Sequence, residues 1–155
     1  MRTGHLHRYF GVERGKGLTR AIAGGATVDE IIHRNVLDRL DFIPTGELPT
    51  NRAEFLLHLN FGTLLEAVGP QYDLVLLDPP PLLAVADALI IGAHAGAVFL
   101  VTRSAVTTEG QINESIKRLN HAGISPRGVL FNDMALRLGD YRSQYGGGPQ
   151  LAYVA

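Results

Sequence analysis

Three short, almost entirely apolar segments constrain the fold of this chain more than any other feature. They read YDLVLLD, GAVFLVTR and PRGVLFN, and helical patterns separate them along the 155 residues. A strand that is apolar on both faces is typical of a parallel sheet, because helices then cover each face. The pattern therefore predicts an α/β fold, a parallel sheet flanked by helices, with strands near 40–44, 73–78, 97–103 and 128–132.

The helical patterns lie before, between and after these segments. HLHRYFG, GLTRAIAGG and TVDEIIHRN predict three short helices, the third with Thr27 as its N-cap. A long amphipathic helix is predicted in TNRAEFLLHLNFGTLLEAVG, where Asn51 and Glu54 fit a capping box, and a buried helix in AVADALIIGAHA. TTEGQINESIKRLNHAGI predicts a second amphipathic helix, capped by Thr107 or Thr108.

The regular pattern ends near residue 133. The last residues, from 134 to 155, are polar and Gly-rich and contain three tyrosines. Such a composition cannot bury enough apolar surface to hold a fixed structure. The sequence therefore predicts one α/β domain over residues 1–133 and a flexible tyrosine-containing tail over residues 134–155.

Charge and composition exclude several classes of protein. The formal net charge of -1 provides no electrostatic field for nucleic acid, so we expect no nucleic-acid partner. The chain has no cysteine, hence no disulfide and no thiolate metal site, which suits a reducing compartment. Its apolar stretches are shorter than the roughly 20 residues that a membrane helix needs. These features lead us to expect a soluble, cytoplasmic chain.

The segment VLLDPPP, residues 75–81, combines a strand-like apolar run with one carboxylate and three prolines. In α/β proteins, ligands bind where parallel strands end, and an aspartate there can hold magnesium directly or through a bound water. The order of apolar residues, Asp78, two further residues and Pro81 is that of a Walker B segment. The alternative is a strand that simply ends in an Asp-Pro turn, and this segment alone does not decide between them.

Several segments, taken in order, resemble the catalytic domain of bacterial tyrosine kinases. They are HLHRYFGVERGKGLTRAIAG, FIPTGELPTNRAEFLLH, YDLVLLDPPPLLAVADA, VFLVTRSAVTTEGQINESIKRL and GISPRGVLFND, followed by the tyrosine-bearing tail. These kinases are cytoplasmic domains or partners of inner-membrane polysaccharide co-polymerases that control capsule and exopolysaccharide chain length. The resemblance implies a P-loop NTPase fold, of which this chain would be the C-terminal part, magnesium ATP as cofactor, and a ring of subunits at the inner membrane.

The resemblance also implies roles for single residues. Asp78 would be the Walker B carboxylate that holds magnesium and the catalytic residue of the chain. Arg2 would be the last residue of the second Walker motif, whose two aspartates would lie before the first residue. Asn132 stands where related ATPases contact adenine, which an amide that both donates and accepts can do; the alternative is a polar residue in a turn. Arg103 and Asp87 are expected at the same rim of the sheet, where each could contact the ligand. The alternatives are a solvated charge for Arg103 and an acid in the first turn of a helix for Asp87.

The main departure from the family concerns the phosphate-binding loop. No GxxxxGK[ST] occurs in the chain, and ERGKGLT mimics it only in part, since Phe10 stands where the first glycine belongs. Without that loop no backbone amides or lysine bind the β and γ phosphates. We therefore expect an N-terminally truncated kinase that binds ATP weakly or not at all and is inactive alone. The missing strands would leave one side of the sheet uncovered.

Tyr141, Tyr145 and Tyr153 lie in the tail and match the position of the family's phosphorylated tyrosines, so the resemblance implies phosphorylation there by a neighbouring subunit. Their number is small for the family, and incidental aromatic residues are the alternative. Two other functions remain open at this stage. One is a non-catalytic module that regulates a polysaccharide co-polymerase by binding it. The other is part of an ATPase that positions septa or partitions plasmids, which would not explain the tyrosines.

Overall fold

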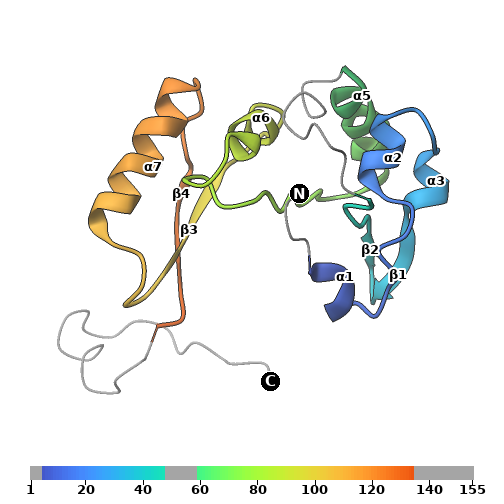
Figure 1. Cartoon of the computed structure of the whole chain (residues 1–155), viewed down its shortest axis with the longest axis horizontal. Helices are drawn as coiled ribbons and strands as arrows, with labels where there is room; N and C mark the ends of the chain where they lie inside the picture. Colours follow the sequence, from blue (N-terminus) through green and yellow to red (C-terminus); the bar gives the residue numbers. More distant parts are fainter. Residues whose placement is uncertain (1–4, 48–58, 135–155) are drawn as a thin grey trace.

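A parallel pair of strands and the helix that connects them form one part of the molecule (Figure 1). The structure is a computed structural model that describes residues 5–47 and 59–134, and only the backbone of residues 59 and 60. Strand β3, Phe99–Arg103, pairs in parallel with β4, Gly128–Asn132, and α7, Glu109–His121, lies between them in the chain. This β-α-β unit confirms the predicted α/β class.

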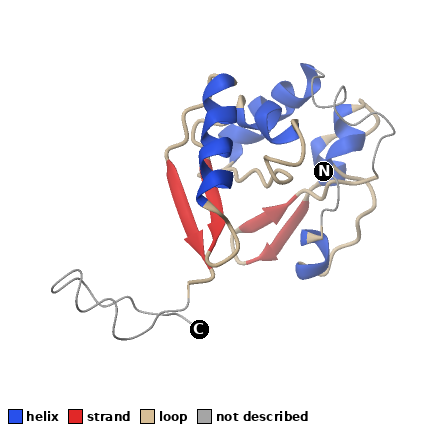
Figure 2. Ribbon diagram, turned by 60° about the vertical axis from the view of Figure 1, so that its left-hand side comes forward, coloured by secondary structure: helices blue, strands red, loops and turns tan. Residues whose placement is uncertain are grey.

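A second part of the molecule lies on the other side of α6 in Figure 1 and is built mainly from short helices. Strands β1 and β2 form an antiparallel hairpin beside these helices, and Figure 2 shows it as a pair separate from β3 and β4. The elements of this part are α1 Leu6–Tyr9, α2 Leu18–Ile22, α3 Val28–Ile31, β1 His33–Leu37, β2 Leu40–Phe42, α5 Leu59–Val68 and the 3₁₀ helix η1 Gly69–Gln71. Helix α6, Asp87–Gly92, follows in the chain.

Two helices begin with the capping signals that the sequence predicted. The backbone amide of Thr27 donates to Glu30 Oε2 at 2.9 Å ahead of α3. At α7, Gln111 N donates to Thr108 Oγ1 at 3.2 Å, and Thr108 N donates to Gln111 Oε1 at 3.0 Å. These contacts satisfy amide groups that the first turn of a helix leaves unpaired. Asn51 and Glu54, the predicted cap of α5, lie outside the described residues.

The described hydrophobic core consists of two clusters that share the helices α2 and α5. Ile22, Phe61 and Ile91 form the first, against which Leu77 packs. Ile31, Leu64 and Val68 form the second, against which Tyr72 packs. The chain segment that leads to Asp78 is therefore held by side chains on both clusters.

Two of the four predicted strands differ from the structure. Residues 73–78 form no strand, and Leu74 and Leu76 are 71% and 80% exposed. Residues 40–42 are a strand, as predicted, but they pair antiparallel with β1 rather than joining a parallel sheet. An apolar run does not specify which strand it pairs with, or in which direction, which explains both errors.

The apolar side chains of the parallel pair are only partly covered by the described residues. Phe99, Val101 and Leu130 lie in register on one face, and each is more than half exposed. On the other face Thr102 is buried, while Val129 and Phe131 of β4 remain exposed. The expectation that missing strands leave one side of the sheet uncovered stays a prediction, because exposed side chains occur on both faces of this pair. Among the described residues, no helix is both long and apolar enough to cross a membrane.

Candidate nucleotide site

Arg103 and Asn132 end two neighbouring parallel strands and lie directly opposite each other. They are the last register pair of β3 and β4, so their side chains leave the same face of the sheet. Ser104 N donates to the carbonyl oxygen of Asn132 at 2.9 Å and extends the ladder one step beyond the strands. The structure thus brings together two of the predicted site residues at the carboxyl edge of the sheet, where α/β folds bind ligands.

Asp133 connects the side chains of this pair. Arg103 Nε donates to Asp133 Oδ2 at 2.8 Å, and Asp133 N donates to Asn132 Oδ1 at 2.9 Å. The backbone of Asp133 has φ 57°, the left-handed conformation that aspartate tolerates better than most residues. The loop after β3 is fixed as well, because Arg103 N donates to Thr107 Oγ1 at 2.9 Å. Sequence reasoning missed Asp133, although the strand-end pair Asn132-Asp133 is typical of a turn.

Asp78 presents an exposed carboxylate just after the anchored Leu77. No hydrogen bond or ion pair joins its side chain to another residue in the described part of the chain. A free carboxylate fits magnesium, which binds proteins through one or two carboxylates and otherwise keeps water and phosphate oxygens. No group of three or more His, Asp or Glu residues that could hold a metal occurs within 5–47 and 59–134, so Asp78 would act without a protein cage. That Asp78 lies within nucleotide range of Asn132 stays a prediction.

Asp87 is buried rather than exposed at a rim. It is the first residue of α6 and is 2% exposed, so the expectation of a first-turn helix acid is the one that agrees with the structure. Its Oδ2 atom has no hydrogen-bond partner among the residues that the structure describes. The carboxylate of Asp87 therefore faces the packed interior of the described chain and is not available as an open ligand contact.

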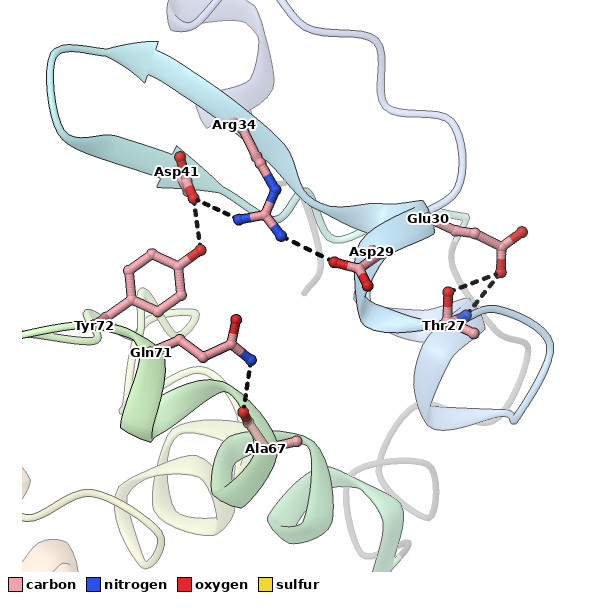
Figure 3. Close-up of polar contacts among 8 residues, drawn as sticks. All are labelled: Thr27, Asp29, Glu30, Arg34, Asp41, Ala67, Gln71 and Tyr72. Atoms are coloured by element: carbon pink, nitrogen blue, oxygen red, sulfur yellow. Dashed lines mark hydrogen bonds and ion pairs between the residues drawn. The ribbon is translucent and has the colours of Figure 1, made fainter.

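Asp41 and Tyr72 link the β1–β2 hairpin to the segment that precedes Asp78 (Figure 3). The hydroxyl of the half-buried Tyr72 donates to Asp41 Oδ2 at 2.6 Å, and Asn35 N donates to Asp41 Oδ1 at 2.7 Å. These bonds lower the pKa of Asp41, and the bond to Asp41 raises the pKa of Tyr72. Arg34 also donates to Asp41 and, at 2.9 Å, to Asp29. Sequence reasoning did not find this network, because Asp41 and Tyr72, the pair that links the two segments, lie 31 residues apart.

A hollow in the described structure lies away from these residues. It measures about 730 Å³ and is lined by residues near the amino ends of β3 and β4, among them Gly96, Val98, Gly123 and Arg127. Its walls are mainly small residues, without a convergent group of ionisable side chains. Because parallel sheets bind ligands at the opposite edge, we assign the candidate site to the end that carries Arg103 and Asn132. Arg2, Tyr141, Tyr145 and Tyr153 lie outside the described residues.

Comparisons with known proteins concern the chain as a whole. No protein-family model matches the chain. EpsB of Ralstonia solanacearum, named as a tyrosine-protein kinase, is 49% identical over 146 residues, which are 94% of this chain and 19% of EpsB. The tyrosine-protein kinase Wzc of Salmonella typhimurium is 37% identical over 142 residues, 92% of this chain and 20% of Wzc.

A solved structure matches almost the whole described fold. The kinase domain of the Escherichia coli tyrosine kinase ETK superposes with a TM-score of 0.82 at 30% identity, over 98% of this chain and 57% of that domain. The chain thus spans about a fifth of the two full-length relatives and little more than half of the solved domain. Sequence and structure together show that the chain belongs to the bacterial tyrosine kinases and corresponds to part of their kinase domain.

Proposed function

We propose that this chain is part of an autophosphorylating protein-tyrosine kinase that regulates capsular or exopolysaccharide synthesis and export. The observation that carries the proposal is the 49% identity to EpsB over 94% of the chain, with the matching fold of a tyrosine-kinase domain. The cofactors are ATP and magnesium. The kinase class accounts for the Asp78 carboxylate at the end of the segment 73–78 and for the polar residues at the ends of β3 and β4.

Each described site residue has a role in this proposal. Asp78 holds magnesium, directly or through water, and magnesium when bound neutralises charge on the phosphates of ATP. Asn132 and Arg103 contact the nucleotide at the carboxyl edge of β3 and β4. The side chain of Leu77, packed on the first core cluster, fixes the position from which the Asp78 carboxylate projects.

The partners belong to the same proposal. Neighbouring kinase subunits form a ring, and the tail tyrosines of one subunit, Tyr141, Tyr145 and Tyr153, enter the site of another. A polysaccharide co-polymerase of the inner membrane, fused or separate, holds the kinase at the cytoplasmic face. Phosphorylation adds about -1.5 to -2 charges per tyrosine at neutral pH, so modified tails of adjacent subunits repel each other and loosen the ring.

The purified chain should bind ATP poorly, because its 155-residue sequence contains no GxxxxGK[ST] motif. Isothermal titration of the purified chain with magnesium ATP should give weak binding or none. Micromolar affinity would contradict the idea that the missing loop limits binding.

Phosphorylation in trans tests the proposed function directly. The chain is incubated with an active full-length relative and magnesium ATP, and phosphotyrosine is mapped by mass spectrometry. Label should appear on the tail and should disappear in a triple variant with phenylalanine at Tyr141, Tyr145 and Tyr153. Label confined to Tyr9 or Tyr72, or no label, would remove the support for a kinase tail and favour a binding module.

A further inference from the structure

We infer that Asp133 is a positioning residue for the nucleotide base: it fixes the side chains of Arg103 and Asn132 in the orientation that receives the base. The inference rests on the proposed nucleotide site and adds a residue to it. Among the described residues, Asp133 is hydrogen-bonded to the side chains of both members of the strand-end pair, through its carboxylate to Arg103 and through its backbone amide to Asn132.

The bond from Asp133 sets the orientation of the Asn132 side-chain amide. The backbone N–H of Asp133 can only donate, so the atom of the Asn132 amide that faces it at 2.9 Å is the oxygen. The amide nitrogen of Asn132 therefore points away from Asp133. No described residue accepts from its hydrogens, so a ligand acceptor such as a ring nitrogen of a purine can use them. The oxygen keeps a second lone pair for an amino group. Asp133 thus selects one of two amide orientations.

The carboxylate of Asp133 sets the plane of the Arg103 guanidinium. Its Nε–H is bonded to Asp133 Oδ2 at 2.8 Å, which leaves the two terminal nitrogens and the flat face of the guanidinium unused by that bond. A planar guanidinium can stack on an aromatic ring, a use for which a fixed plane is needed. Because Arg103 and Asn132 are register partners, the Asp133 carboxylate holds the guanidinium plane of Arg103 beside the two N–H donors of the Asn132 amide.

The ion pair between Arg103 and Asp133 is too exposed to serve mainly the stability of the fold. The side chains of Arg103 and Asp133 are 64% and 58% exposed, and an ion pair this exposed contributes little to folding. Asp133 nevertheless adopts φ 57°, a conformation that costs a residue with a side chain more than it costs glycine. A surface pair that contributes little to folding fits a residue that orients its neighbours rather than one that holds the fold.

The test uses the full 155-residue chain, isotope-labelled, and adenosine as the probe, because adenosine has no phosphates and does not depend on a phosphate loop. Nuclear magnetic resonance follows the Arg103 Nε–H and the Asn132 side-chain amide during titration. In the wild type, adenosine should shift both signals. Asp133→Gly, which keeps the left-handed backbone but removes the carboxylate, should weaken adenosine binding by roughly two- to fivefold, the range of an exposed charged contact.

Two further variants complete the design. Asp133→Asn removes the charge and keeps an αL-tolerant side chain, so it should also weaken binding, and it gives the answer if Asp133→Gly disturbs the backbone spectrum of β4. Asp38→Asn removes one exposed acid from the hairpin turn and should bind adenosine like the wild type. Both variants keep the backbone N–H that bonds Asn132 and alter only the carboxylate that holds Arg103. If both bind adenosine as tightly as the wild type, the positioning role of the Asp133 side chain is wrong and the nucleotide site stands. If adenosine moves neither signal in the wild type, the base subsite itself is refuted, and the role of Asp133 with it.

Discussion

Replacing Gly17 with alanine should separate α2, which contributes Ile22 to the first core cluster, from the chain that follows β2. Gly17 is buried at the N-cap of α2, where its backbone is extended, with φ -156°. A Cβ atom there would lie 2.4 Å from both Gly46 N and Pro44 O, whereas ordinary van der Waals contact begins at 3.4 Å. Both neighbours are backbone atoms, so no side chain can rotate away, and the segments must part by about 1 Å.

The cost follows from the hydrogen bonds that such a separation stretches. Leu18 N donates to Pro44 O at 2.9 Å and Thr19 N donates to Thr45 O at 3.0 Å. A further 1 Å takes both beyond bonding distance, at about 1 kcal/mol each. Overpacking of a buried site adds about 1 kcal/mol or more. We expect Gly17→Ala to lower the free energy of unfolding by roughly 3 kcal/mol, and the melting temperature by about 6–12 °C for a chain of this size.

Urea and thermal denaturation followed by circular dichroism measure this loss. The matched control is Gly110→Ala in α7, because the nearest atom to its Cβ is Thr108 Oγ1 at 4.0 Å. Since alanine is the better helix former, that control should be neutral or gain up to about 1 kcal/mol. A Gly17→Ala protein as stable as the wild type would refute the reasoning, because it would mean that α2 and the chain after β2 are not packed as closely as described.

Three further predictions concern other supports of the fold. Asp41 has a lowered pKa and Tyr72 a raised pKa, so their hydrogen bond stabilises the fold at neutral pH. This stabilisation is lost as the pH falls below 3.8, the ordinary value of an aspartate, and through the folded-state pKa of Asp41. It is also lost as the pH rises above 10.0, the ordinary value of a tyrosine, and through the folded-state pKa of Tyr72. Urea midpoints of the wild type and Tyr72→Phe should therefore converge at both extremes of pH, and parallel curves would count against the bond. Thr108→Ala removes the acceptor for Gln111 N and should cost about 1 kcal/mol by thermal denaturation, whereas an unchanged melting temperature would show that the cap is not formed. Leu77→Ala should cost roughly 1–2 kcal/mol, less than a fully buried leucine because Leu77 is half-buried, and an unaltered urea midpoint would place it outside the core.

Short-range signals predicted the parts of the structure that they control. Thr108 and Gln111 stand three residues apart, and their capping box forms because both partners belong to the same turn. The strands that end at Arg103 and Asn132 were also predicted, since each is a continuous apolar run bounded by turn residues. Their meeting at one edge follows from the geometry of parallel pairs, so this part of the candidate site could be predicted as well.

Features that depend on distant partners could not be predicted in the same way. The run at 73–78 has the composition of a buried strand, yet hydrogen-bond pairing depends on another strand lying beside it, and none of the described residues supplies one. Asp41 occupies the middle of β2, where alternation alone gives it no special role, and its bond to Tyr72 spans 31 residues. The hairpin that contains Asp41 was missed for a related reason, because β1 continues directly from the helical pattern of α3.

The candidate site rests on two kinds of support that should fail independently. Asp78 is positioned by a side chain, since Leu77 packs on the cluster that α2 and α5 share, whereas the segment itself has no backbone ladder within the described chain. Arg103 and Asn132 are positioned by backbone pairing of β3 with β4. Loosening the core through Gly17→Ala should therefore increase amide exchange in the segment before Asp78 more than at the ends of β3 and β4, because local opening follows the contacts that hold each segment. Equal changes at both places would mean that the two supports form one cooperative unit, and that the magnesium residue and the base-contacting pair are held by a single core.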